Sequence, residues 1–214
     1  MTADIAMPVA APRNRAENRV YRRESLIRSA IATVGRYDLT GATVERICHG
    51  AGASRGLIAH YFDSKEELLL AAAGETFDAQ AMAVKKAIAN DRSLRPDDAI
   101  KRMARSSFEP PIFSPDAIAA WQAFTNASRS QPVFLDVIRQ VSEHLQELYE
   151  PAFAAAATKR NVSLDAAHAA LGLITVVDGL WNNLATGRDG LGPKDAIQVA
   201  ERYIDGCLLG TGRP

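Results

Sequence analysis

Residues 43–68, TVERICHGAGASRGLIAHYFDSKEEL, decide the fold of this chain, because they hold two short helical patterns separated by a glycine turn. Thr43 is placed to N-cap the first helix, since its hydroxyl can accept a hydrogen bond from a first-turn amide. Three apolar residues then recur at helical spacing and predict one buried stripe: Val44, Ile47 and Cys48. Gly50 and Gly52 predict the end of this helix, because glycine takes the left-handed conformation without a Cβ penalty.

A second short helix is expected to begin after Ser54 and to run from Arg55 to about Tyr61. Its apolar residues are expected to face inward: Leu57, Ile58 and Phe62. The other side chains are expected to face outward: Arg55, Gly56, Ala59, His60 and Tyr61. Two short helices joined by a tight glycine turn predict a helix-turn-helix, the motif whose second helix enters the major groove of DNA.

At these positions the chain resembles the N-terminal domain of TetR-type one-component repressors. The residues that match the family pattern are Thr43, Ala51-Gly52-Ala53-Ser54, Gly56, Tyr61-Phe62, Lys65 and Leu68. Ala59 departs from it, because the family often has tyrosine there, so no phosphate contact is expected from this position. The resemblance implies an all-α fold, with an N-terminal three-helix helix-turn-helix domain followed by a C-terminal helical ligand-binding and dimerisation domain.

Seven residues of this stretch are candidates for DNA contacts. Arg55 could bond bidentately to guanine, and Gly56 would let the backbone approach the groove. The others are expected to contact phosphates, which fixes register and supplies salt-dependent affinity: Thr43, Ser54, His60, Tyr61 and Lys65. Each of these residues alone could be an ordinary cap or an exposed polar residue, so the DNA hypothesis depends on the set.

Charge is distributed unevenly along a chain whose net charge is zero. Residues 1–65 carry ten Lys and Arg against six Asp and Glu, whereas residues 66–214 carry fifteen against nineteen. Such asymmetry is expected when one end meets a polyanion. Much of the positive charge gathers just before and within the start of the first predicted helix: Arg13, Arg15, Arg19, Arg22 and Arg23. These arginines could contact the phosphate backbone, or they could simply form a solvated tail.

We expect a flexible arm (residues 1–17), a DNA-binding domain (18–63) and a ligand-binding and dimerisation domain (64–214). The DNA-binding domain would add a first helix over residues 18–37 and is too small to bury much surface alone. Ser64 and Glu67 form a predicted capping box. The helix that it opens should have about 25 residues and span roughly 37 Å, enough to link the two domains mechanically.

The rest of the chain keeps helical patterns and shows no strand-like alternation. Further helices are expected over 97–107, from Pro115, from Pro132 past Pro151, over 164–185 and over 195–209. The last two are apolar on most sides, which predicts burial on more than one face. Packing against a twofold mate would form an intermolecular four-helix bundle, and the resemblance implies the same homodimer.

Five residues of this domain are candidates for binding a small-molecule effector: Trp121, Phe124, Tyr149, Asp178 and Trp181. Asp178 lies in an apolar run, three residues before Trp181, and a buried acid needs a partner or a ligand. A carboxylate beside tryptophans can capture a quaternary ammonium group through cation–π attraction. Alternatively, Asp178 could pair across the dimer or cap a neighbouring helix while the aromatic residues fill the core.

Residues 119–124 (AAWQAF) and 177–181 (VDGLW) resemble the BetI branch of the family, and His60-Tyr61-Phe62 also suits it. This branch comprises choline-responsive repressors of glycine-betaine synthesis genes, so the resemblance implies choline or another quaternary ammonium compound as effector.

The two cysteines, Cys48 and Cys207, lie far apart in apolar helical patterns and are expected to be reduced. Neither a signal peptide nor a run of 18 apolar residues is found, so a cytoplasmic protein without a membrane span is expected. No nucleophile elbow, P-loop, dinucleotide fingerprint or zinc framework is present, and no enzyme activity, cofactor or metal is expected.

The sequence therefore predicts a ligand-responsive transcriptional regulator, a repressor that a small molecule releases from a quasi-palindromic double-stranded DNA operator. Two alternatives stay open at this point. One is an all-helical small-molecule-binding protein or enzyme without DNA function, and the other is an activator or architectural DNA-binding protein.

Overall fold

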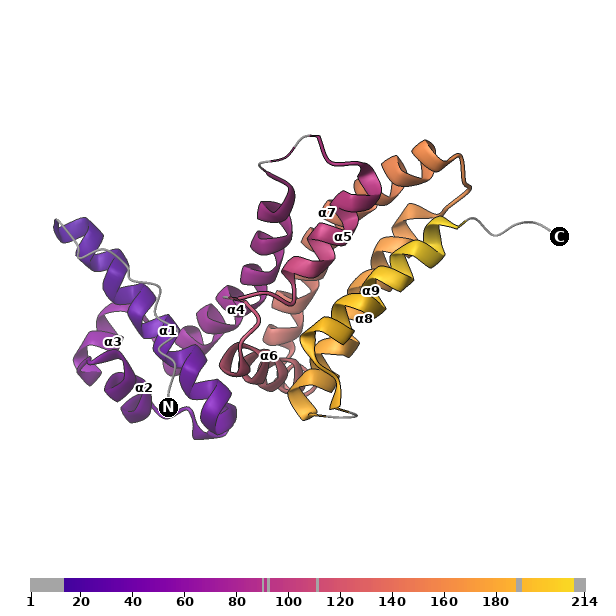
Figure 1. Cartoon of the computed structure of the whole chain (residues 1–214). Helices are drawn as coiled ribbons and strands as arrows, with labels where there is room; N and C mark the ends of the chain where they lie inside the picture. The colour runs from indigo at the N-terminus through magenta and orange to yellow at the C-terminus, as the bar shows by residue number, and fades with distance from the viewer. Residues whose placement is uncertain (1–13, 90, 92, 111, 188–189, 210–214) are drawn as a thin grey trace.

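The computed structural model describes residues 14–89, 91, 93–110, 112–187 and 190–209, and in these residues it is helical without strands. The predicted all-α fold is therefore confirmed (Figure 1). The helices are α1 (Arg15–Gly41), α2 (Val44–Ala51), α3 (Arg55–Tyr61), α4 (Lys65–Ala89), α5 (Pro96–Ser106), α6 (Pro115–Ala127), α7 (Pro132–Arg160), α8 (Ala166–Thr186) and α9 (Pro193–Leu208). We call α1–α3 the head and α4–α9 the body.

Helix α1 begins three residues before the predicted helix over residues 18–37. At the other end the regular helical backbone stops where predicted, because Asp38, which follows Tyr37, is non-helical although the element extends to Gly41. Its N-cap is Asn14, whose side-chain oxygen accepts a hydrogen bond of 2.9 Å from the Glu17 amide. Residues 15–17 were expected in the flexible arm but belong to this helix, because the cap fixes the first turn. The rest of that predicted arm, residues 1–13, lies outside the described residues.

Helix α4 has the predicted 25 residues, and Gly74 lies within it without interrupting it. The predicted capping box is present in a modified form. Ser64 Oγ accepts a hydrogen bond of 3.0 Å from the Glu67 amide, as expected. The Glu67 carboxylate, however, accepts its bond of 2.6 Å from the amide of Asp63, one residue before Ser64. Side-chain oxygens therefore satisfy two backbone amides at the start of α4, those of Asp63 and Glu67.

Proline at the first helical position opens α5, α6, α7 and α9. Its fixed φ suits a helix start, and its missing amide hydrogen would have no intrahelical acceptor there. In α7, by contrast, Pro151 lies within the helix, which continues to Arg160 and ends at Asn161 in the left-handed conformation. The continuation of α7 past Pro151 was predicted.

One continuous hydrophobic core runs through the head and the body. Helix α1 contributes Leu26 and Val34 to this core, and its Gly35 lies against the start of α6. A Cβ atom at Gly35 would lie 2.7 Å from the carbonyl oxygen of Asp116, so only glycine allows the two helices to approach this closely. The head is thus packed directly on the body, in addition to its covalent link through α4.

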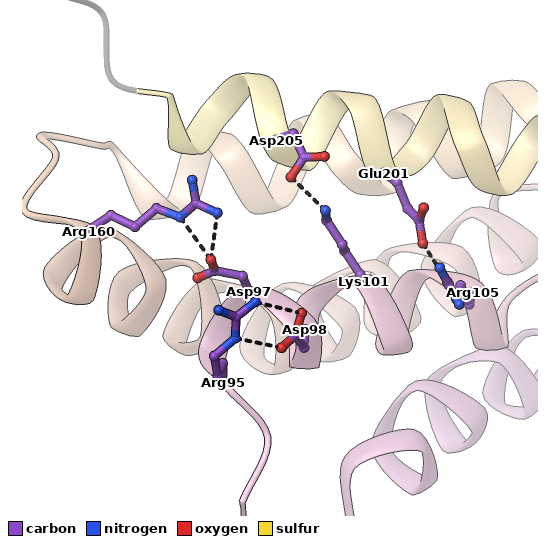
Figure 2. Close-up of polar contacts among 8 residues, drawn as sticks. All are labelled: Arg95, Asp97, Asp98, Lys101, Arg105, Arg160, Glu201 and Asp205. Atoms are coloured by element: carbon purple, nitrogen blue, oxygen red, sulfur yellow. Dashed lines mark hydrogen bonds and ion pairs between the residues drawn. The ribbon is translucent and has the colours of Figure 1, made fainter.

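Ion pairs join α5 to α7 and α9 within the body (Figure 2). Lys101 Nζ lies 2.7 Å from Asp205 of α9, and Arg105 pairs with Glu201 of the same helix. At the start of α5, Asp97 is buried, and a single one of its oxygens accepts hydrogen bonds from Arg160 of α7. Two of these contacts therefore link α5 to α9, and the third links α5 to α7.

A strained residue lies at the end of α1. Asp38 has a φ of 57° and a ψ of 177°, a combination that is almost restricted to glycine. Its carbonyl oxygen accepts a hydrogen bond of 3.0 Å from the Ala42 amide, which helps to close the turn into α2. The turn that positions the helix-turn-helix is therefore formed at a conformational cost.

We predict that Asp38→Gly stabilises the protein by about 1 kcal/mol, because relief of backbone strain outweighs the greater unfolded-state entropy of glycine. Urea unfolding at a fixed protein concentration would measure this gain. Asn161→Gly is the matched control, because asparagine tolerates the ordinary left-handed conformation found there (φ 55°, ψ 43°). Equal or lower stability of Asp38→Gly relative to wild type would contradict the prediction.

Candidate DNA interface and effector site

The first helix of the motif begins and ends where the sequence predicted. Thr43 caps α2, with its hydroxyl oxygen accepting a hydrogen bond of 3.3 Å from the Arg46 amide. Gly52 ends the helix in the left-handed conformation, with a φ of 58°. Gly50 was expected to end it as well but lies inside α2, where a Cβ would approach Ser29 Oγ of α1 to 2.5 Å. Its role is thus close packing between α1 and α2, which Ser29 reinforces by donating a hydrogen bond of 2.8 Å to the Ile47 carbonyl.

The second helix, α3, spans the predicted residues and is buried on one side only. Ile58 and the following Phe62 are buried, and Leu57 is half-buried. The exposed residues include Arg55, Gly56, Ala59 and His60. Helix α3 therefore offers one face to an external partner.

The residues predicted to contact phosphates differ in their exposure and in their contacts within the protein. Ser54 is exposed at the N-cap position of α3, and its side chain makes no capping hydrogen bond. Tyr61 is half-buried and packs against the core, with its ring 4.9 Å from that of His60 in an edge-on arrangement. Lys65 is half-buried as the first residue of α4. All seven predicted DNA-contacting residues thus lie in the helix-turn-helix or at the start of α4.

Arg55 has an intramolecular partner that the sequence did not reveal. Its guanidinium lies 3.6 Å from the Glu45 carboxylate of α2, and the two side chains are 74% and 80% exposed. A pair this exposed contributes little to stability, so Arg55 can exchange Glu45 for an external acceptor at low cost. No local periodicity relates residues ten positions apart across a turn, which is why the pair escaped prediction.

The aromatic candidates of the body lie in its core. Trp121 of α6 and Trp181 of α8 are 7% and 2% exposed, and their rings pack edge to face with centroids 5.6 Å apart. Trp181 also donates a hydrogen bond of 3.0 Å from Nε1 to the carbonyl oxygen of Ser107. Phe124, three residues after Trp121, is also buried, but its ring packs against Phe134 of α7. The structure therefore brings the two tryptophans together.

Tyr149, one of the predicted effector residues, has an enclosed hydroxyl group, as do Ser107 and Thr125, which were not predicted. The hydroxyls of Ser107, Thr125 and Tyr149 are inaccessible to solvent. Within the described part of the chain none has a partner in good hydrogen-bond geometry, although the Ser107 and Tyr149 side chains lie near enough to interact. Burial raises the pKa of the Tyr149 phenol, and the nearby Ser107 side chain offsets part of that rise. Buried hydroxyls without partners are costly, so these groups could accept or donate hydrogen bonds to a ligand or to water.

Asp178 is partly buried, and burial raises the pKa of its carboxyl to about 6. Within the described residues it has neither an ion-pair nor a hydrogen-bond partner. An acid in this state favours a nearby cation, whether that cation comes from a ligand or from another subunit.

Two open clefts lie away from these five candidate effector residues. One, of about 690 Å³, is lined by α1, α2 and the start of α6, and the other, of about 460 Å³, is lined by the ends of α5, α7 and α9. The residues that the structure describes form no cluster of three or more potential metal ligands. Nor does any described helix have the length and apolar character needed to cross a membrane. Cys48 and Cys207 are both free thiols.

Comparison with known proteins agrees with this architecture. Residues 26–72 match the model of the bacterial regulatory proteins of the tetR family, and residues 96–209 match that of the BetI-type transcriptional repressor C-terminal domain. The HTH-type transcriptional regulator BetI 2 of Chromohalobacter salexigens is 32% identical, over 89% of this chain and 90% of its own length.

Solved structures resemble the whole chain. A transcriptional regulator of Pseudomonas aeruginosa PAO1 superposes with a TM-score of 0.78 and 26% identity, over 96% of this chain and 97% of its own. A regulator of Saccharomonospora viridis, solved in complex with choline, superposes with a TM-score of 0.74 and 19% identity, over 87% and 96%. Together with the matched residues, these likenesses show that the chain belongs to the TetR family of bacterial DNA-binding transcriptional regulators, with a C-terminal domain of the BetI type.

Proposed function

We propose that this regulator is a homodimeric repressor that binds a quasi-palindromic operator through α3 and leaves it when a small quaternary ammonium compound binds the body. The observation that carries the DNA part is the half-buried state of α3, which fixes the helix in the head and leaves Arg55, Gly56 and His60 exposed. Because the partner is chromosomal DNA, we also propose a cytoplasmic location.

The chemistry of each side chain decides whether it contacts a base or a phosphate of the DNA. Arg55 leaves Glu45 and bonds to a base edge, while Gly56 allows the backbone to approach the groove. Thr43, Ser54, His60, Tyr61 and Lys65 contact phosphates and so fix the register of α3 on the duplex. Thr43 and Lys65 stand at helix starts, where free amides also favour an anion.

Exposed apolar residues on α8 and α9 support the homodimer. Leu171 of α8 is 47% exposed and Val199 of α9 is 43% exposed, although both helices also contribute to the core. The two helices lie at the side of the body away from the head (Figure 1). Pairing them with the same helices of a second copy forms a four-helix bundle and places two heads on one duplex, as half-sites one turn or a multiple apart require.

The proposed effector site consists of Trp121, Phe124, Tyr149, Asp178 and Trp181. Support comes from the edge-to-face tryptophans, from the carboxylate of Asp178 without a partner among the described residues, and from Ser107, which accepts the Trp181 hydrogen bond and lies near the Tyr149 hydroxyl. The BetI-type match and the choline complex of the Saccharomonospora viridis regulator point to the same ligand class. Choline offers a cation for the rings and the carboxylate, and a hydroxyl for the Tyr149 group.

Effector binding has to change the packing of the body, because the two tryptophans are closed against each other. A ligand that inserts there favours an arrangement in which the rings are apart. Release from DNA requires only that this arrangement bind the ligand more tightly and match the operator spacing less well.

For the DNA interface, we predict two distinct classes of variant. Arg55→Ala should lose roughly 10- to 100-fold discrimination at one base pair, because a bidentate pair contributes about 1–3 kcal/mol. Lys65→Gln and Tyr61→Phe should weaken binding to all sequences. Only Lys65→Gln, which removes a charge, should also make the plot of log K against log salt shallower, by about 0.9 for the lost phosphate contact. Duplexes selected from a random library with wild-type protein serve as probes in fluorescence anisotropy.

Lys86→Gln, an exposed lysine near the far end of α4, is the control for charge alone and should leave affinity unchanged. If Arg55→Ala and Lys65→Gln weaken every duplex to the same extent, the assignment of Arg55 to a base edge is wrong. If wild-type protein selects no sequence from the library, the operator proposal itself fails.

For the effector, we predict that Asp178→Asn lowers choline affinity about tenfold or more, because a charge-assisted contact contributes roughly 1.5–3 kcal/mol. Since burial raises the pKa of Asp178 to about 6, wild-type affinity should rise as the pH is raised through that value and then level off. The Asp178→Asn variant should lack this dependence, because an amide does not titrate in this range. Titration calorimetry at several pH values measures both effects.

The matched ligand control is the uncharged carbon analogue of choline, in which a tert-butyl group replaces the trimethylammonium group. Its affinity should be insensitive to Asp178→Asn, because it carries no charge for the carboxylate. Asp136→Asn, which removes an exposed acid of α7, should not affect choline binding. A wild-type protein that binds both compounds equally at all pH values would rule out this role for Asp178.

A further inference from the structure

We propose that the first two turns of α1 form a second DNA-binding surface, which contacts the phosphate backbone beside the half-site that α3 occupies. Its residues are Arg15, Arg19 and Arg22, which we call the arginine stripe. This inference rests on the proposed operator binding and extends it by a contact surface outside the helix-turn-helix.

The three arginines lie on one side of α1. At 100° per residue, their directions fall within about 60° of one another. The nearby acids, Glu17 and Glu24, point about 180° away by the same count. The start of α1 therefore has a cationic face and an opposite face that carries its acids.

The arginine stripe continues a face that is buried farther along the same helix. Leu26, Ser29 and Thr33 share its direction by helical periodicity, and all three are buried. Ser29 donates its hydrogen bond to the Ile47 carbonyl of α2, so this face is turned toward the helix-turn-helix. The arginine stripe thus extends from the motif on the motif's own side of α1, over about 10 Å of helix.

A direct contact joins this part of α1 to the end of α3. The Arg23 guanidinium, one residue beyond the arginine stripe, lies over the ring of Phe62 at a distance of 5.1 Å from its centroid. Phe62 is buried and directly follows α3. The start of α1 extends beyond the rest of the head on the side where α3 lies, away from the body (Figure 1). DNA that approaches α3 therefore comes near the arginine stripe.

All three arginines are exposed and have no ion-pair partner among the residues that the structure describes. The nearby acids do not neutralise them, since Glu24 pairs with Arg28 and Glu17 lies on the opposite side of the helix by periodicity. Like charges spaced three and four residues apart on a helix repel one another, so this arrangement is unfavourable in the free protein. A polyanion bound along the arginine stripe would offset that repulsion by attracting all three charges. Duplex DNA is such a polyanion, with a phosphate charge about every 1.7 Å of its axis.

The test is the salt dependence of duplex binding by the triple variant R15Q/R19Q/R22Q. The probe is the duplex selected with wild-type protein, used once with long flanks and once trimmed to the half-sites. With long flanks, we expect the plot of log K against log salt to become shallower by about 2 to 3 for each head bound. Trimming should weaken wild-type binding and leave the triple variant unaffected, and R15K/R19K/R22K should behave as wild type because it keeps the charges.

The matched control is K85Q/K86Q/R129Q, which removes the same charge from exposed residues of the body. Circular dichroism and thermal unfolding verify that each variant is folded. If the triple variant and this control show the same slope, or if trimming affects both proteins equally, the arginine stripe does not contact DNA. If wild-type protein shows no salt-dependent duplex binding at all, the proposed function fails instead.

Discussion

The close packing of α1 against α6 is the constraint on which the rest of the structure depends. A three-helix head of this size buries too little surface to be stable alone, so it shares one hydrophobic core with the body. Gly35 allows the α1 backbone to lie directly on the Asp116 carbonyl, where any side chain would force the helices apart. The position of the head is therefore set by body packing, and a change in that packing must move the head or strain this contact.

Within the head, the same principle positions α3. Gly50 and the Ser29 hydrogen bond bring α2 close to α1, and Gly52 then turns the chain so that α3 can bury Ile58. Each of these contacts lies on the inner side of the motif. Because the inner side provides most of the packing, the exposed residues Arg55, Gly56 and His60 are available to a partner.

The features that could be predicted from sequence are those with local signals. The bounds of α3, the end of α2 at Gly52 and the length of α4 follow from caps, glycine and helical periodicity. Asn14 and Glu17 also form a local start signal for α1. The sequence nevertheless predicted a later start, because the prolines before Asn14 indicated an irregular arm. By contrast, the Arg55–Glu45 pair, the packing role of Gly50 and the buried Ser107 hydroxyl depend on tertiary contacts, which no spacing along the chain specifies. The ion pairs between α5 and α9 belong to the same group.

The closed tryptophan pair relates the two proposed sites to each other. Trp121 lies on α6, the helix against which α1 packs, and Trp181 lies on α8, whose outer face carries exposed Leu171. A ligand that separates these rings displaces α6, α8 or both. Movement of α6 reaches the head through Gly35, whereas movement of α8 would reach the second subunit of the proposed dimer. Because a close-packed interior transmits displacement rather than absorbing it, no separate relay between ligand and DNA is needed. The ligand can shift the equilibrium only by the difference between its affinities for the separated and the closed tryptophans. The more stable the closed contact is, the weaker the observed affinity for the effector must be.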